Sequence, residues 1–245
     1  MTGATVERKP HASRNLASRK AKGLKIERLL GLADRAGPVR MLDIGTGSGG
    51  VAHYFAAHPT LDFEVTSIDV VDQRQISDGY RFLQVESVAL PFPDKCFDVV
   101  ITNHVIEHVG PARDQLEHLK EVRRVMHPEG VGYLAVPNRW MLVEPHYRLA
   151  FLSWLPRPLR TPYLRFRGVG EFYDCEPLTV PQLERLLSEA GFAFHHLHLE
   201  SVRQTLLIEG AVGLRRCVTW FPDWLLMMLR RASPTLIYTI QHSRY

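Results

Sequence analysis

The stretch LDIGTGSGG, residues 42–50, decides the fold because a glycine-rich turn follows an apolar strand there. Gly45, Gly47 and Gly50 satisfy G-x-G-x-x-G, the dinucleotide fingerprint. Gly45, Gly47 and Gly49 equally satisfy G-x-G-x-G. In both patterns glycine permits a tight strand-to-helix turn and lets bare backbone approach a ligand. The turn therefore predicts a ligand that contains an adenosine, either a dinucleotide or another compound.

Asp43 separates these two interpretations. A dinucleotide-binding strand is usually apolar just before its first glycine, because a pyrophosphate lies nearby. A carboxylate two residues before Gly45 would repel phosphates and attract a cation such as an ammonium group. Asp43 therefore favours a ligand with a positively charged tail.

Short apolar segments alternate with helical patterns along the chain, which predicts parallel strand pairing and a three-layer α/β fold. Helical patterns are found in 24–33, 48–58, 111–127 and 179–190, where Thr179 is a candidate N-cap. The predicted strands are 39–44, 63–70, 80–86, 97–103, 130–138, 192–202 and 234–241.

The composition is that of an ordinary globular chain of 245 residues, 45% hydrophobic and 23% charged. The sequence contains no run of 18 apolar residues, so we expect no transmembrane helix. Its three cysteines, Cys96, Cys175 and Cys217, are far apart and form no C-x-x-C pair. This pattern argues against a disulfide framework and favours a reducing, cytoplasmic location.

The net charge of +4 is concentrated at the start of the chain. Residues 1–28 hold eight Lys or Arg against Glu7 and Glu27, whereas the rest of the chain is slightly acidic. We expect residues 1–22 to form a flexible basic arm.

Four motifs occur in the order found in a known family. MLDIGTGSGG resembles the first motif of the class I S-adenosylmethionine-dependent methyltransferases, and Asp69 ends the second strand about 20 residues later. VESVALPFPDKCFDVVITNHVIEHV and LKEVRRVMHPEGVGYLAVPN resemble later parts of the same fold. The resemblance is close over 39–138 and loose over 179–200 and 234–241. It implies one methyltransferase domain over 1–245: a Rossmann-like sandwich with a mostly parallel seven-stranded sheet, an antiparallel C-terminal strand and a helical insertion after the fifth strand.

The resemblance also assigns roles in binding S-adenosyl-L-methionine. Asp43 would attract the methionine ammonium, and Asn103 would face the methionine portion. Asp69 would hold the ribose hydroxyls, and Glu86 would accept a hydrogen bond from the adenine amino group. The adenine position usually carries Asp after Gly, so Val85-Glu86 is a departure from the family pattern. The implied cofactor-binding residues are Asp43, Gly45, Thr46, Gly47, Gly49, Asp69, Val70, Glu86, Ser87 and Asn103.

HVIEH, residues 104–108, matches H-x-x-E-H, a zinc-protease pattern. On a helix His104 and His108 would share a face. However, His104 directly follows a predicted strand, Pro111 comes three residues after His108, and no third ligand is evident downstream. We therefore expect no metal, a structural role for His108, and a place for His104 near the substrate.

Methyl transfer to a hydroxyl needs a general base, and histidine suits this task near neutral pH. The candidate catalytic residues are His146 and His104. His146 lies in an aromatic- and Arg-rich insertion, residues 139–178, which we expect to cover the active site. A second apolar segment, residues 205–231, is predicted to be helical.

The expected acceptor is a small molecule: a glycan, a lipid-linked intermediate or an aromatic compound. The expected alternatives are a nucleotide-dependent oxidoreductase and a non-catalytic cofactor-binding module. Peripheral membrane contact through 205–231 is a further possibility. A nucleic-acid substrate is disfavoured because the fourth strand ends in TNHV, not in Asn/Asp-Pro-Pro-Tyr. The sequence does not indicate the oligomeric state.

Overall fold

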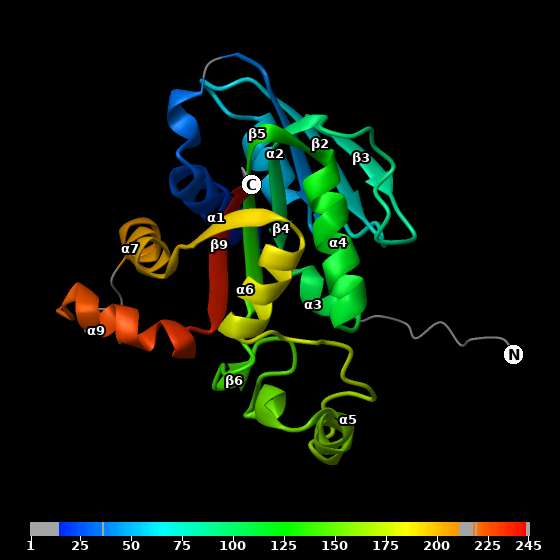
Figure 1. The fold of residues 1–245 in the computed structure, drawn as a ribbon, viewed down its shortest axis with the longest axis vertical. Coiled ribbons are helices and arrows are strands. Elements are labelled where there is room, and N and C mark those ends of the chain that lie inside the picture. The colour runs from blue at the N-terminus through cyan, green and yellow to red at the C-terminus, as the bar shows by residue number, and fades with distance from the viewer. Residues whose placement is uncertain (1–14, 36, 211–217, 219, 244–245) are drawn as a thin grey trace, which may run out of the picture.

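A seven-stranded sheet organises the part of the chain that our computed structural model describes, residues 15–35, 37–210, 218 and 220–243 (Figure 1). Its strand order is β3-β2-β1-β4-β5-β9-β8, and only β9 runs antiparallel to its neighbours β5 and β8. This arrangement confirms the predicted α/β fold with an antiparallel C-terminal strand. The strands are β1 (Val39–Ile44), β2 (Phe63–Asp69), β3 (Arg81–Gln84), β4 (Phe97–Asn103), β5 (Met126–Pro137), β8 (Phe192–His196) and β9 (Thr235–His242).

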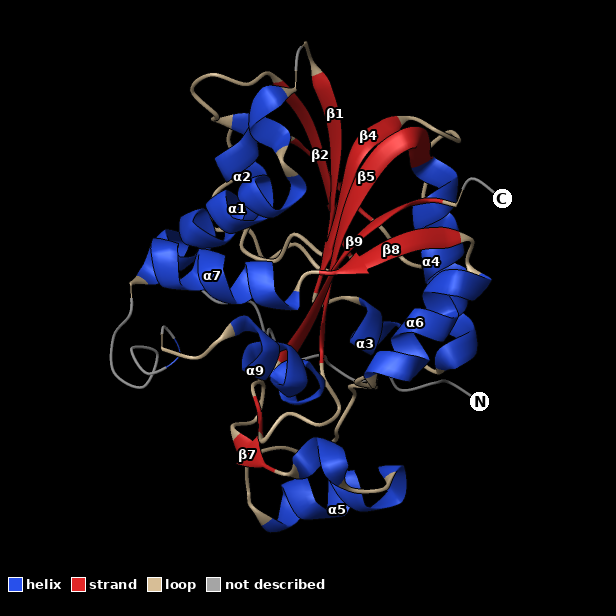
Figure 2. Cartoon of the chain, turned by 60° about the vertical axis from the view of Figure 1, so that its left-hand side comes forward, coloured by secondary structure: helices blue, strands red, loops and turns tan. Residues whose placement is uncertain are grey.

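Helices cover both faces of the sheet (Figure 2). One face carries α1 (Leu16–Leu30), α2 (Gly50–Ala56) and α7 (His198–Glu209), and the other carries α4 (Ala112–Val125) and α6 (Val180–Glu189). Each face has its own apolar core. In α6 the Thr179 side chain accepts a hydrogen bond from the Gln182 backbone N–H. The Gln182 side chain accepts one from the Thr179 backbone N–H, which completes a capping box. The short helices are η1 (Leu32–Asp34) and α3 (Ile106–Val109).

The insertion after β5 folds into a small unit beyond the carboxyl ends of β4 and β5 (Figure 1). It contains β6 (Val143–Glu144), β7 (Leu149–Ala150), η2 (Leu152–Trp154) and α5 (Arg157–Phe166). Leu149, Leu152, Leu164, Tyr173 and Cys175 form an apolar cluster of their own. The insertion is thus partly helical, as predicted, and it stands next to the edge of the sheet where the glycine turn begins.

Two predictions for local structure were wrong. Residues 16–22, predicted as part of a flexible arm, belong to α1, which packs against α2 and α7. Residues 1–14 of the predicted arm lie outside the described residues. The strand predicted over 192–202 ends at His196, and residues from His198 on belong to α7.

The predicted apolar helical segment 205–231 includes the end of α7, α9 (Asp223–Met228) and most of η3 (Leu229–Ala232). Residues 211–217 and 219 of this segment lie outside the described residues. Large apolar side chains are exposed along the rest of it, including Trp220, Trp224 and Met228. None of the described helices has both the length and the apolar composition that crossing a membrane requires.

Candidate cofactor and active site

The glycine turn between β1 and α2 has the geometry that only glycine adopts without strain. The φ angles of Gly45, Gly47 and Gly49 are 74°, 53° and 78°. An added Cβ would lie 2.4 Å from a methyl group of Val105 at Gly45, and 2.2 Å from the Ile76 carbonyl oxygen at Gly49. Gly50 has no such angle and begins α2. The backbone therefore follows the G-x-G-x-G pattern.

Asp43 lies at the carboxyl end of β1 with only 3% of its surface exposed. Its Oδ2 atom and the nearby Ser48 Oγ have no hydrogen-bond partner among the described residues. Burial raises the pKa of Asp43 to about 6, against the opposing influence of Thr46 and Arg19. A buried carboxylate oxygen without a donor is costly, and a ligand ammonium group would satisfy it.

Asp69 ends β2 and contacts the glycine turn directly. Its Oδ2 accepts from the Gly47 backbone N–H at 2.8 Å, and its Oδ1 accepts from the Val70 N–H at 2.7 Å. The structure therefore brings Asp69 and Val70 to the turn, as the parallel register of β1 and β2 requires.

Glu86 and Ser87 follow β3 and are exposed. The Val85 backbone N–H donates to the Asp69 carbonyl at 3.0 Å, so this segment begins beside the end of β2. The residues predicted for the adenine and the ribose thus lie along one edge of the sheet.

Helix α1 adds two basic side chains that the sequence analysis did not identify as site residues. Arg19 packs closely on the turn: a Cβ added at Gly50 would lie only 2.5 Å from the Cβ of Arg19. Lys22 Nζ donates to Asn103 Oδ1 at the end of β4, with 3.5 Å between the atoms. Burial, together with Lys25 and Arg19, lowers the pKa of Lys22 to about 8. The Asn15 N-cap signal just before LASRK could have revealed this helix.

His104 and His108 do not form the shared metal face that H-x-x-E-H suggests. His104 precedes the four-residue helix α3, has a φ of 60°, and contacts buried Glu107 Oε1 through Nδ1 at 3.2 Å. Burial alone would raise the pKa of Glu107, but the hydrogen bond and charge of His104, with His108 nearby, hold it below its usual value. His104 follows Asn103 directly, so it lies at the expected acceptor side of the cofactor residues.

His146 lies in the turn between β6 and β7, inside the insertion. Its Nδ1 is 2.6 Å from Oε1 of buried Glu144 and 3.8 Å from Cys175 Sγ. Burial lowers its pKa, but Glu144, Glu107 and Asp174 more than offset this and hold the pKa above its usual value. Burial, with the charges of nearby carboxylates, raises the pKa of the Cys175 thiol well above its usual value. Each candidate base therefore contacts a different buried carboxylate: His104 contacts Glu107, and His146 contacts Glu144.

Known proteins match both the sequence and the fold of this chain. Residues 42–134 match a family described as a methyltransferase domain. A fatty-acid O-methyltransferase of Mycolicibacterium smegmatis is 37% identical over 97 residues, which cover 37% of this chain and 34% of that protein. A ubiquinone/menaquinone biosynthesis C-methyltransferase of Azotobacter vinelandii is 26% identical over 193 residues, 72% of each chain.

The solved structure of an S-adenosylmethionine-dependent methyltransferase from Mesorhizobium loti superimposes with a TM-score of 0.59 at 16% identity. The superposition covers 93% of this chain and all of that one, and shows a shared fold. With the order of motifs and strands, these matches define a Rossmann-like methyltransferase domain. Residues 42–134 thus correspond to a methyltransferase domain, and the described chain has the fold of a solved S-adenosylmethionine-dependent methyltransferase.

Proposed function

We propose that this chain transfers a methyl group from S-adenosyl-L-methionine to a small-molecule acceptor. The observation that carries the proposal is Asp43, a buried carboxylate with an unsatisfied oxygen beside a turn of positive-φ glycines. This donor set suits an amino-acid ammonium group and opposes a pyrophosphate. It therefore favours the methyltransferase over the nucleotide-dependent oxidoreductase.

The proposed cofactor residues contact the ligand from the ends of four strands, β1, β2, β3 and β4. Asp43 would bind the methionine ammonium, and Asn103 would face the same portion. Asp69 would accept from the ribose hydroxyls, and Glu86 would accept from the adenine amino group. Backbone and side-chain atoms that complete the site would come from Gly45, Thr46, Gly47, Gly49, Val70 and Ser87.

Arg19 and Lys22 extend this site toward the methionine carboxylate. Both come from α1 and lie near Asp43 and Asn103, the residues proposed for the methionine side. Their positive charges would attract the methionine carboxylate of the cofactor, which the negative charge of Asp43 would otherwise repel. We propose that α1 completes the amino-acid end of the cofactor site.

The sulfonium of the cofactor supplies the leaving group, so the protein mainly aligns the acceptor and removes its proton. We propose His104 as the general base, because it follows Asn103 and because the Glu107 carboxylate orients its ring. His146, the other candidate, contacts Glu144 and Cys175 within the insertion.

The acceptor is proposed to be apolar over much of its surface. The insertion exposes aromatic side chains next to the carboxyl edge of the sheet, including Trp140, Phe151 and Trp154. The two relatives named above are, by their names, a fatty-acid and a quinone-biosynthesis methyltransferase. A lipid-like or aromatic acceptor agrees with both observations.

We also propose that residues 205–231 contact a membrane surface from the cytoplasmic side. The support is the group of exposed apolar side chains on and before α9 and on η3, namely Trp220, Phe221, Trp224, Met227, Met228 and Leu229. A reducing compartment agrees with Cys96 and Cys175, which are both free.

Calorimetry with two ligands tests the cofactor proposal. S-adenosylhomocysteine is expected to bind and to raise the melting temperature, whereas NAD⁺ at the same concentration should do neither. Binding of NAD⁺ without S-adenosylhomocysteine would contradict the proposal.

Mass spectrometry of a lipid extract treated with protein and deuteriomethyl cofactor then identifies the acceptor. Products that carry the label are expected. Tight S-adenosylhomocysteine binding without labelled product in lipid, quinone or whole-cell extracts would favour the non-catalytic module.

A further inference from the structure

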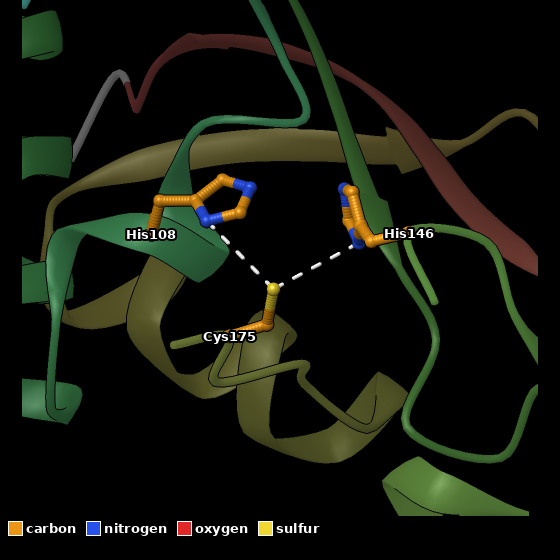
Figure 3. Close-up of side chains that lie close together, drawn as sticks. All are labelled: His108, His146 and Cys175. Atoms are coloured by element: carbon orange, nitrogen blue, oxygen red, sulfur yellow. Dashed lines mark hydrogen bonds between the residues drawn. The ribbon is translucent and has the colours of Figure 1, made fainter. Parts of the chain in front are cut away.

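Three metal-ligating side chains converge where the insertion meets the sheet domain (Figure 3). His108 comes from α3, His146 from the turn between β6 and β7, and Cys175 from the segment that precedes α6. One ligand atom of each lies within 4.8 Å of those of the other two. His108 and Cys175 are 67 residues apart in sequence, so the tertiary fold alone brings them together.

The distances in this cluster are close to those around a tetrahedral metal ion. Cys175 Sγ is 3.7 Å from His108 Nδ1 and 3.8 Å from His146 Nδ1. With zinc–sulfur and zinc–nitrogen bonds of about 2.3 and 2.0–2.1 Å, a tetrahedral site puts sulfur and nitrogen roughly 3.5 Å apart. Each sulfur–nitrogen pair therefore needs to close by only about 0.2–0.3 Å to match a tetrahedral site.

Two carboxylates adjoin the three donors. Asp174 Oδ1 lies 3.6 Å from Cys175 Sγ, and Asp174 Oδ2 lies 3.9 Å from His108 Nδ1. Glu144, which is 1% exposed, contacts the His146 ring. This contact uses His146 Nδ1, the same atom that faces Cys175 Sγ, so a bound ion would take the place of the hydrogen bond to Glu144 and leave that carboxylate beside the site. The acidic surroundings also balance the charge of a divalent cation.

We propose that His108, His146 and Cys175 bind one zinc ion and that Asp174 is the group placed to take the fourth position. Sulfur and imidazole donors select against Mg²⁺ and Ca²⁺, which prefer oxygen ligands, and suit tetrahedral Zn²⁺. The ion would connect α3 to the β6–β7 turn and to the stretch before α6 that contains Cys175. It would thereby fix the insertion over the carboxyl edge of the sheet.

This site differs from the H-x-x-E-H interpretation that the sequence suggested and disfavoured. His104 is not a ligand, because it contacts Glu107 instead. The second and third ligands, His146 and Cys175, both come from the insertion. A zinc-bound His146 cannot serve as a general base, which leaves that role to His104.

Metal analysis of untagged full-length protein tests the proposal. After incubation with zinc and dialysis, the wild-type chain is expected to retain about one zinc per chain. Cys175→Ala and His146→Ala are expected to lose it. Cys96→Ala is the matched control, because Cys96 is a free cysteine outside the cluster, and it should retain the metal.

Cobalt substitution gives a second measurement that needs no variant. Cobalt added to the metal-free wild-type chain is expected to produce a thiolate-to-cobalt charge-transfer band and the intense visible bands of a tetrahedral site. The proposal is overturned if wild-type protein holds neither metal after dialysis, or if Cys175→Ala retains zinc. Binding of S-adenosylhomocysteine to each variant, measured in parallel, shows whether the variant has folded.

Discussion

At the scale of the residue, Asp43, which we propose to bind the cofactor, shows how a buried carboxylate can lower the stability of a protein. The unperturbed carboxyl of this residue titrates at 3.8, and burial raises its pKa to about 6. Between these two pH values the folded chain binds the proton more tightly than the unfolded chain does. The contribution of Asp43 to the free energy of unfolding therefore falls as pH rises from about 4 to 6 and stays low at pH 7.

Asp43→Asn should remove this pH-dependent cost. The stability of the variant relative to wild type is expected to increase by on the order of 3 kcal/mol between about pH 4 and pH 7, since one pKa unit corresponds to about 1.4 kcal/mol. The same variant should lose S-adenosylhomocysteine binding, because an amide attracts an ammonium group far less than a carboxylate does. Urea denaturation without ligand at both pH values, with calorimetry at pH 7, measures the two effects.

Asp62→Asn serves as the control for this experiment because Asp62 is exposed. It should change neither the pH dependence nor the binding. A stability difference between Asp43→Asn and wild type that is the same at both pH values would show that the carboxylate carries no such cost.

At the scale of the element, α1 connects the start of the chain to the cofactor site. It packs against α2 through Gly23, whose α-hydrogens face the ring of Tyr54: a Cβ there would lie 2.4 Å from two ring carbons. The Tyr54 hydroxyl donates to Glu27 on the same helix. The close contact between Gly23 and Tyr54 thus sets how near α1, with Arg19 and Lys22, lies to the glycine turn.

Gly23→Ala should therefore lower stability although alanine is the better helix former. Alanine contributes about 1 kcal/mol of helix propensity, whereas overpacking costs about 1–3 kcal/mol. Because the clash involves the base of the Tyr54 ring, we expect the second effect to dominate. Denaturation should show a net loss, and calorimetry should show weaker S-adenosylhomocysteine binding as α1 moves outward.

Lys20→Ala tests whether any change in α1 has this effect. Lys20 is exposed on the same helix, so both measurements should stay near the wild-type values. A Gly23→Ala chain more stable than wild type, with unchanged affinity, would mean that α1 packs less closely than the structure shows.

At the scale of the whole molecule, the regular part of the fold was predictable from sequence because local signals and topology agree there. Each buried strand is a short apolar run in the sequence, and the order of the motifs indicates that these strands form one sheet. The strand ends that carry Asp43, Asp69 and Asn103 could be placed at one edge for the same reason. At the end of β8 the apolar pattern continued through Leu197, but α7 begins at His198, where local spacing did not indicate a helix.

The cluster around Cys175 was not predictable in this way. Its three donors come from segments with no shared pattern, and only the packing of the insertion brings them together. Arg19 and Lys22 were missed for a different reason. A run of basic residues is usually solvated, and here the charges lie on a helix that tertiary contacts hold against the sheet domain.

The exposed apolar segment around α9 provides a whole-molecule test, since the membrane contact proposed for it would place the whole protein at a membrane surface. Fully burying a large apolar side chain contributes about 1.5–3 kcal/mol, so losing two of them should weaken membrane binding at least roughly tenfold. Trp220 and Trp224 are 84% and 65% exposed, so replacing both with serine should leave the fold intact. Wild-type chain should co-sediment with phosphatidylglycerol vesicles, and the double variant should remain largely in the supernatant.

Phe166→Ser on α5, at a side chain 85% exposed, is the matched control and should still co-sediment. Equal sedimentation of all three proteins would exclude α9 as the membrane contact, because then neither tryptophan contributes to the binding.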